Sequence, residues 1–180
     1  MEIIFISPST LDRKLLVYTI ICVLLWMILG SLFIYLSFST KNVLPSLVTV
    51  LISIFFIIDC ICTPYKYVLT NSEFLIKRHF KDIVIPLHSI KTIRLLSPAE
   101  KKIRYCRNNG ASGCFGLWGN WRLAMHNKVW LYVRRYNNWT LIETDREKYV
   151  IAPDDPQLID AVAQQIGKTE TRQVFNKINE

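Results

Sequence analysis

Residues 15–38 read LLVYTIICVLLWMILGSLFIYLSF, a run of 24 residues without a charged side chain. At about 1.5 Å per residue, a helix of this length reaches roughly 36 Å, enough to cross a hydrocarbon core of ~30 Å. A secretory signal peptide carries a shorter apolar core and a small-residue cleavage site, and neither is visible here. The run therefore predicts a transmembrane helix over residues 15–38.

A second apolar run, VLPSLVTVLISIFFIIDCIC, covers residues 43–62 and contains one charged residue, Asp59. Pro45 falls in the first turn, where a helix loses no hydrogen bond to a missing N–H. The alternative is a buried core helix of a soluble protein, which the lack of an amphipathic stripe disfavours. Because only residues 39–42 separate the two runs, we expect an antiparallel transmembrane hairpin over residues 15–62.

The basic residues predict the orientation of this hairpin. Residues 1–62 carry three basic and three acidic side chains, so the whole formal charge of +8 lies in residues 63–180. Lys41 is the only basic residue between the runs, whereas Arg13 and Lys14 precede them and four more follow closely: Lys66, Lys77, Arg78 and Lys81. Lysine and arginine are enriched on the cytoplasmic side of membrane proteins. We therefore expect a multi-pass protein of the cell (inner) membrane with both termini cytoplasmic.

Beyond Pro64 the hydrophobic period changes to two, which is typical of β-strands. Residues 66–70 and 73–78 predict a hairpin across Asn71-Ser72, and further strands are expected over 83–87 and 92–96. Residues 97–113 are polar and are expected to form a loop with a turn at 108–110. Residues 128–135 and 139–144 predict a second hairpin across Asn137-Asn138, because asparagine tolerates the positive φ of a tight turn.

The C-terminal part predicts a strand over 149–152 and then an amphipathic helix over 154–167 that ends at Gly167. Residues 168–180 are expected to be a polar tail. At the other end, residues 1–14 either lie at the membrane interface or join the β domain, and the sequence leaves both open. The fold class is α+β: two transmembrane helices, then a β domain over residues 63–167 with about seven strands closed by one helix.

This order of segments resembles the bacterial pleckstrin-homology-like (PH-like) membrane proteins. The resemblance rests on YVLTNSEFLI at 67–76, IVIPL at 83–87, FGLWG at 115–119, and IAPDDP at 151–156 before the helix. It implies a PH-like split β-barrel and leaves the activity open, since a fold does not determine a function. Related domains bind phosphoinositides through basic residues in their first loop, but Asn71-Ser72 holds none.

Basic residues are the candidate contacts to a lipid headgroup or a partner. A basic surface beside an anionic bilayer gains about 1 kcal/mol per charge. The alternative is a solvated surface that only follows the orientation bias. A glycine- and aromatic-rich stretch over 110–121 either presents an aromatic face to lipid or packs into the barrel. The candidate contact residues are Lys77, Arg78, Lys81, Lys101, Lys102, Arg104 and Arg107.

Other function classes find little support in the sequence. His79, His88 and His126 are scattered, no phosphate-binding glycine motif occurs, and the cysteines lack metal-binding spacing. We expect neither an enzyme nor a metal or other cofactor, and no nucleic-acid partner, because the bilayer is the nearer polyanion. The sequence predicts a membrane-anchored binding or scaffold module that recruits a protein or an anionic lipid headgroup. The alternative is an accessory or regulatory subunit of a membrane transporter or envelope assembly, with Gly30 and Ser31 as the helix contact.

Overall fold

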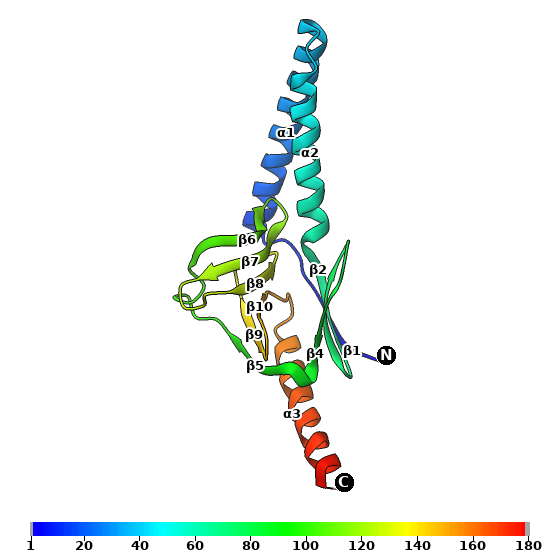
Figure 1. Cartoon of the computed structure of the whole chain (residues 1–180), viewed down its shortest axis with the longest axis vertical. Helices are drawn as coiled ribbons and strands as arrows, with labels where there is room; N and C mark the ends of the chain where they lie inside the picture. The colour runs from blue at the N-terminus through cyan, green and yellow to red at the C-terminus, as the bar shows by residue number, and fades with distance from the viewer. Residues whose placement is uncertain (1, 179–180) are drawn as a thin grey trace.

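The computed structural model describes residues 2–178, and within them the side chains of residues 104–109, 111 and 168–178 lie outside the description. Two long helices leave one side of a β domain, and a third helix leaves the opposite side (Figure 1). The expected α+β arrangement is confirmed: two apolar helices come first, β-structure follows, and a helix ends the chain. The strands form two sheets rather than one closed barrel.

Helices α1 (Arg13–Thr40) and α2 (Leu44–Cys62) form an antiparallel hairpin. Lys41 adopts a left-handed conformation with φ of 53° and ends α1, and α2 starts with proline in its first turn. Gly30 lets the helices approach, since a Cβ atom added there would lie 3.3 Å from Thr49 Cγ2. Both helices are long and apolar enough to cross a membrane, and most of their apolar side chains are exposed.

The N-terminal residues join the β domain. Strand β1 (Ile3–Pro8) pairs antiparallel with β2 (Pro64–Thr70), which answers the question that the sequence left open. The predicted hairpin of β2 and β3 (Glu73–Arg78) is present, and β4 (Ile83–Pro86) completes a sheet of order β1-β2-β3-β4.

The second sheet has six strands in the order β5-β9-β10-β8-β7-β6. Strands β8 (Val129–Val133) and β9 (Thr140–Thr144) do not form the hairpin that the sequence predicts, because β10 (Lys148–Ile151) lies between them. Strand β10 runs parallel to β8 and antiparallel to β9. Asn138 does have a positive φ of 53°, but it belongs to a wider connection.

The predicted polar loop over 97–113 is also wrong. Its second half is strand β6 (Ile103–Gly113), which pairs with β7 (Gly116–Leu123). Strand β5 (Ile90–Leu95) forms the other edge of this sheet, after a single 3-10 turn (Leu87–Ser89). The domain therefore contains more strands than the seven expected, and the β6–β7 hairpin rises beside α2 (Figure 1).

The core lies between the two sheets and α3 (Gln157–Ile178). Tyr67 and Phe74 of the first sheet meet Ile142 of the second sheet and Leu158 of the helix in one buried cluster. Helix α3 does not end at Gly167 as predicted but continues to Ile178. Gly167 therefore lies inside the helix and is not a C-cap, and a Cβ atom added there would meet nothing within 4 Å.

Candidate functional site

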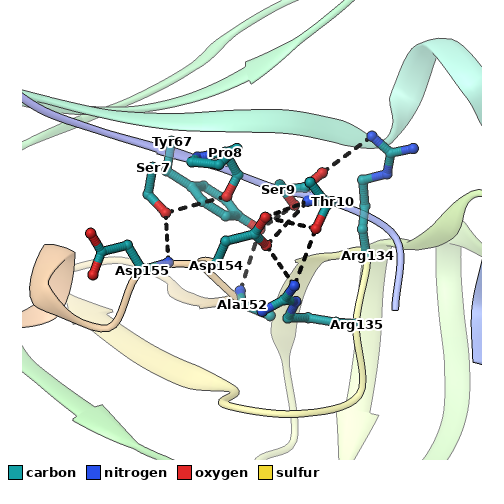
Figure 2. Close-up of polar contacts among 10 residues, drawn as sticks. All are labelled: Ser7, Pro8, Ser9, Thr10, Tyr67, Arg134, Arg135, Ala152, Asp154 and Asp155. Carbon is teal, nitrogen blue, oxygen red and sulfur yellow. Dashed lines mark hydrogen bonds and ion pairs between the residues drawn. The ribbon is translucent and has the colours of Figure 1, made fainter. Parts of the chain in front are cut away.

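The segment that leads from β1 into α1 is bound tightly to the β domain. We call residues 7–12 the N-terminal connector. Asp154 accepts hydrogen bonds from the backbone N–H of Thr10 at 3.1 Å and from its hydroxyl at 2.7 Å (Figure 2). Arg135 forms an ion pair with Asp154 at 2.9 Å and also donates to the Thr10 hydroxyl at 3.1 Å. These contacts join the connector to the β8–β9 connection and to the segment that precedes α3.

The side chain of Tyr67, from β2, reaches the connector (Figure 2). Its hydroxyl donates to the Tyr132 carbonyl at 2.7 Å and accepts from Ala152 N–H and the Ser9 hydroxyl, both at 3.3 Å. Tyr67 is fully buried, and burial raises its pKa to about 12. The hydroxyl therefore stays protonated at neutral pH and keeps its donor role. Arg134 adds a hydrogen bond to the Ser9 carbonyl at 3.2 Å.

Asp154 and Asp155 have different roles. Asp155 accepts a hydrogen bond from Gln157 N–H at 2.9 Å and so caps the start of α3. Its own N–H donates to the Ser7 hydroxyl at 3.1 Å. The Asp154 carboxylate does not cap the helix and binds Thr10 and Arg135 instead. Asp154 thus connects the two ends of the described chain.

The other helix is attached through Asp59, in the last turn of α2. This carboxylate is 8% exposed and accepts hydrogen bonds from Trp118 Nε1 at 2.8 Å and Phe115 N–H at 3.2 Å. A Cβ atom added at Gly113 would lie 1.8 Å from the carboxylate, so only glycine fits there. On α1, the Thr19 hydroxyl donates to the Cys114 carbonyl. The tip of the β6–β7 hairpin therefore touches both helices.

Part of the predicted basic set lies beside the end of α2. We call residues 78–82, which join β3 to β4, the basic turn. Arg78 is the register partner of Pro64, which comes two residues after the end of α2. Lys77 forms an ion pair with Asp82. Burial raises the pKa of Asp82, but hydrogen bonds from Lys77 and from the Arg78 N–H lower it, and the net effect is a pKa below the ordinary value. Lys81 is exposed.

The remaining predicted contacts are not brought to this place. Lys101 and Lys102 precede the start of β6, whereas the opposite end of that strand, Gly113, contacts Asp59. Arg104 and Arg107 lie along β6, and their side chains fall outside the described residues. Lys101 and Lys102 are therefore separate from the basic turn, and a lipid or partner contact at either set stays a prediction.

A model of the bacterial PH domain family matches residues 65–166, more than half of the chain. The chain belongs to the bacterial PH domain family. The match begins three residues after α2 ends and stops inside α3, so it covers the part of the fold for which the sequence resemblance was drawn. Searches of curated proteins and of solved structures each gave no match.

The glycine- and aromatic-rich stretch of the PH domain is structural for the most part. It forms the end of β6 and most of β7, and Trp121 is only 6% exposed in the core. Gly116 has a φ of 148° and Gly119 a φ of 94°, so both occupy backbone conformations that favour glycine. Trp118 is the exception, since it binds Asp59. The packing interpretation is thus right for Trp121 and incomplete for Trp118.

Sequence reasoning assigned no role to Asp59 or Phe80. A single carboxylate inside an apolar run, such as Asp59, indicates a specific partner. Its partners are 54 or more positions away in sequence, and nothing in the sequence pairs them. Phe80 is 79% exposed within the basic turn. An aromatic between His79 and Lys81 was the available signal.

Proposed function

We propose that α1 and α2 cross the cell membrane and hold the PH domain against its cytoplasmic face as a binding or scaffold module. In this role the domain recruits a protein or an anionic lipid headgroup and carries out no catalysis. The supporting observation is the double attachment: the N-terminal connector fixes the start of α1, and Asp59 fixes the end of α2. A domain held at both helices keeps one orientation relative to the membrane, which suits a surface that must face lipid or a membrane-bound partner.

The exposed surface of the helices supports the membrane assignment. In the most apolar 18-residue segment of each helix, only 17% of the residues are buried in α1 and 11% in α2. A core helix of a soluble protein would bury most of its apolar side chains. Exposed apolar surface of this extent is stable in hydrocarbon and not in water. The distribution of lysine and arginine supports cytoplasmic termini.

A topology experiment tests this proposal. An epitope tag at either terminus should be protected from an impermeant reagent in intact cells, and a tag inserted between Lys41 and Asn42 should be accessible. Cross-linking and co-purification from native membranes should then recover lipid or a protein bound to the PH domain. A C-terminal tag reachable from outside intact cells, or a full-length chain that is monodisperse in water without detergent, would contradict the proposal.

A second candidate function, an accessory subunit of a membrane transporter or envelope assembly, is favoured by a groove on the helix hairpin. The groove has a volume of about 250 Å³ and is almost entirely apolar. Gly30 packs against Thr49 of the same chain, and both residues also line this groove, so we expect a partner to contact the groove and not Gly30 alone. Its lining residues are Cys22, Leu25, Trp26, Leu29, Gly30, Phe33, Thr49, Ile52 and Phe56.

Photo-crosslinking within the membrane separates this candidate from the first. A photoreactive residue at position 29, which lines the groove, should form protein adducts if a partner helix occupies it. Position 28 is the control, because Ile28 is 66% exposed and is not among the lining residues. Protein adducts at 29 and not at 28 would favour the subunit role, and lipid adducts at both would exclude it.

A further inference from the structure

The basic turn carries an apolar side chain at its tip. Phe80 is 79% exposed, and its neighbours His79 and Lys81 are exposed as well. A single exposed apolar side chain needs no explanation by itself. Here, however, Phe80 lies between His79 and Lys81, and the position of this turn relative to α2 is relevant to its function.

The register of the first sheet shows where the basic turn lies relative to the end of α2. Strand β2 leads away from the end of α2, and β3 runs back toward it, with Arg78 opposite Pro64. The chain therefore leaves β3 at the end of the sheet where α2 joins β2, and the basic turn lies at that end. Figure 1 shows the connection between β3 and β4 rising to the lower end of α2. The basic turn, which includes Phe80, thus lies at the end of the first sheet nearest to α2.

Local contacts hold the turn in this shape. Arg78 Nε donates to the Lys81 carbonyl at 2.7 Å, and Arg78 N–H donates to Asp82 Oδ1 at 3.3 Å. The His79 ring stacks on Tyr65 with 4.9 Å between centroids. Because the backbone of the turn is closed by these bonds and one flank is braced by Tyr65, Phe80 projects outward from an ordered turn.

The charges around Phe80 suit an anionic surface. Lys66 lies 5.5 Å from the Tyr65 ring, on the same side of the domain, and Lys81 is exposed beside Phe80. Lys77 is compensated by Asp82, so it adds little to the local field. An aromatic side chain flanked by lysines is the usual composition of segments that lie at the boundary between headgroups and acyl chains.

We propose that the basic turn is a membrane-insertion site, in which Phe80 enters the acyl boundary of the leaflet and Lys66 and Lys81 bind phosphates of anionic glycerophospholipids. This inference rests on the proposed function, because the turn reaches the leaflet only if α2 spans it. A lipid surface is preferred over a protein partner because the basic turn lies at the end of the sheet nearest to an exposed apolar helix. The first hairpin turn, Asn71-Ser72, lies at the opposite end of β2 and β3 and takes no part.

Photo-crosslinking of the full chain in nanodiscs tests the insertion site. The discs contain phosphatidylglycerol and phosphatidylcholine, and p-benzoylphenylalanine is placed at residue 80, 55 or 125. Phe55 is 71% exposed in α2 and reports the membrane span. Met125 is 68% exposed in the β7–β8 connection, at the end of β7 away from the helices, and is the matched control. Mass spectrometry should find lipid adducts at 80 and 55 and none at 125.

The outcomes separate the two proposals. Adducts at 55 without adducts at 80 would overturn the insertion site and leave the membrane span intact. Absence of adducts at both 55 and 80 would overturn the proposed function and the insertion site together. Equal adduct yields at 80 and 125 would overturn the insertion site too, because any exposed residue would then react.

A charge variant tests the preference for anionic lipid. Lys81→Ser should lower the adduct yield at residue 80 about fivefold, the factor that corresponds to about 1 kcal/mol for one charge near an anionic leaflet. In the chain that retains Lys81, the adduct yield at residue 80 should also fall when phosphatidylglycerol is replaced by phosphatidylcholine. Lys91→Ser is the control, since Lys91 lies at the start of β5 and pairs with Asp145 at 3.0 Å. Equal losses in both variants would overturn the assignment of Lys81.

Discussion

At the scale of single residues, Asp59 is the side chain with the most demanding environment. A carboxylate that is 8% exposed at the end of an apolar helix loses much of its hydration. Trp118 Nε1 and Phe115 N–H replace the lost water with two hydrogen bonds, and Gly113 leaves the space that the carboxylate occupies. Hydrogen bonds to a charged acceptor are stronger than neutral ones. Asp59 therefore determines where the β6–β7 hairpin meets α2.

Asp59→Ala should destabilise the full chain by about 1–3 kcal/mol, because two partly buried donors lose their acceptor. The measurement is thermal unfolding in detergent, followed by tryptophan fluorescence so that the signal includes Trp118. Glu2→Ala is the control, since Glu2 is an exposed carboxylate that accepts one hydrogen bond from Asn71 at 2.9 Å. Equal stability of the two variants would show that the Asp59 contact is energetically unimportant.

Glu100 predicts a specific loss of stability in acid. Two hydrogen bonds from Arg94, at 2.7 and 3.1 Å, and one from Ser97 N–H at 2.9 Å hold the pKa of Glu100 well below its usual range. The unfolded chain has the higher pKa, about 4.3. The stabilisation is therefore complete above that pH and is lost as the pH falls below it.

Glu100→Gln should lower the melting temperature at pH 7 and remove part of the acid dependence. The measurement is the melting temperature of both proteins between pH 7 and pH 3. The difference between them should shrink as the pH falls below about 4. A constant difference across this range would mean that protonation of Glu100 is not linked to folding.

At the scale of secondary-structure elements, the sequence predicted which segments are strands better than it predicted their partners. The β2–β3 hairpin is right because its two-residue connection, Asn71-Ser72, leaves only one partner available. Strands β8 and β9 show the same alternation, but β10 pairs with both of them. Periodicity reports which face of a strand is buried and does not report the order of strands in a sheet.

The prediction of a loop in place of strand β6 was wrong for a related reason. Asn108-Asn109-Gly110 is a turn signal in sequence, yet Gly110 pairs with Gly119 in a sheet that has an irregular register there. Local composition cannot include the long-range pairing that overrides it. The candidate site shared this limit: Asp59 and Trp118 are 59 positions apart, so their contact is a product of the fold.

Two glycines allow a test, because Gly167 lies in a helix where alanine also fits, whereas Gly116 has a backbone conformation that favours glycine. Gly167→Ala should stabilise α3 by about 0.5–1 kcal/mol, since alanine is the better helix former and the added Cβ meets nothing within 4 Å. Gly116→Ala should destabilise the domain, because Gly116 has a φ of 148° and the Cβ would lie 2.6 Å from the Val133 carbonyl. Helix content and melting temperature from circular dichroism measure both effects. Destabilisation by Gly167→Ala would indicate that the helix ends there after all.

At the scale of the whole molecule, the PH domain is held at the base of the helix hairpin by contacts at separate points. The N-terminal connector binds Asp154 and Arg135, and Asp59 binds the β6–β7 hairpin. A domain attached only through the α2–β2 peptide could rotate about that single point. Two attachments restrict rotation, and this restriction keeps the basic turn toward the end of α2.

The connector is the attachment that can be loosened without touching the core. Asp154→Ala removes the acceptor for both donors of Thr10 and the ion pair with Arg135. Loss of a partly buried charged acceptor costs about 1–3 kcal/mol. Arg13 and Lys14, which are exposed at the start of α1, should then be cut by trypsin roughly tenfold faster, since cleavage follows the population of the opened segment.

Limited proteolysis of the full chain in nanodiscs measures this effect, with mass spectrometry to identify the cut after Arg13 or Lys14. Asp145→Ala is the matched control, because Asp145 forms an exposed ion pair with Lys91 far from the connector. Surface ion pairs of this kind contribute little to stability, so the control should be cut at the wild-type rate. If Asp154→Ala is also cut at that rate, the Asp154 contacts do not hold the connector, which is then held by β1 pairing and by the bonds of Ser9 to Tyr67 and Arg134.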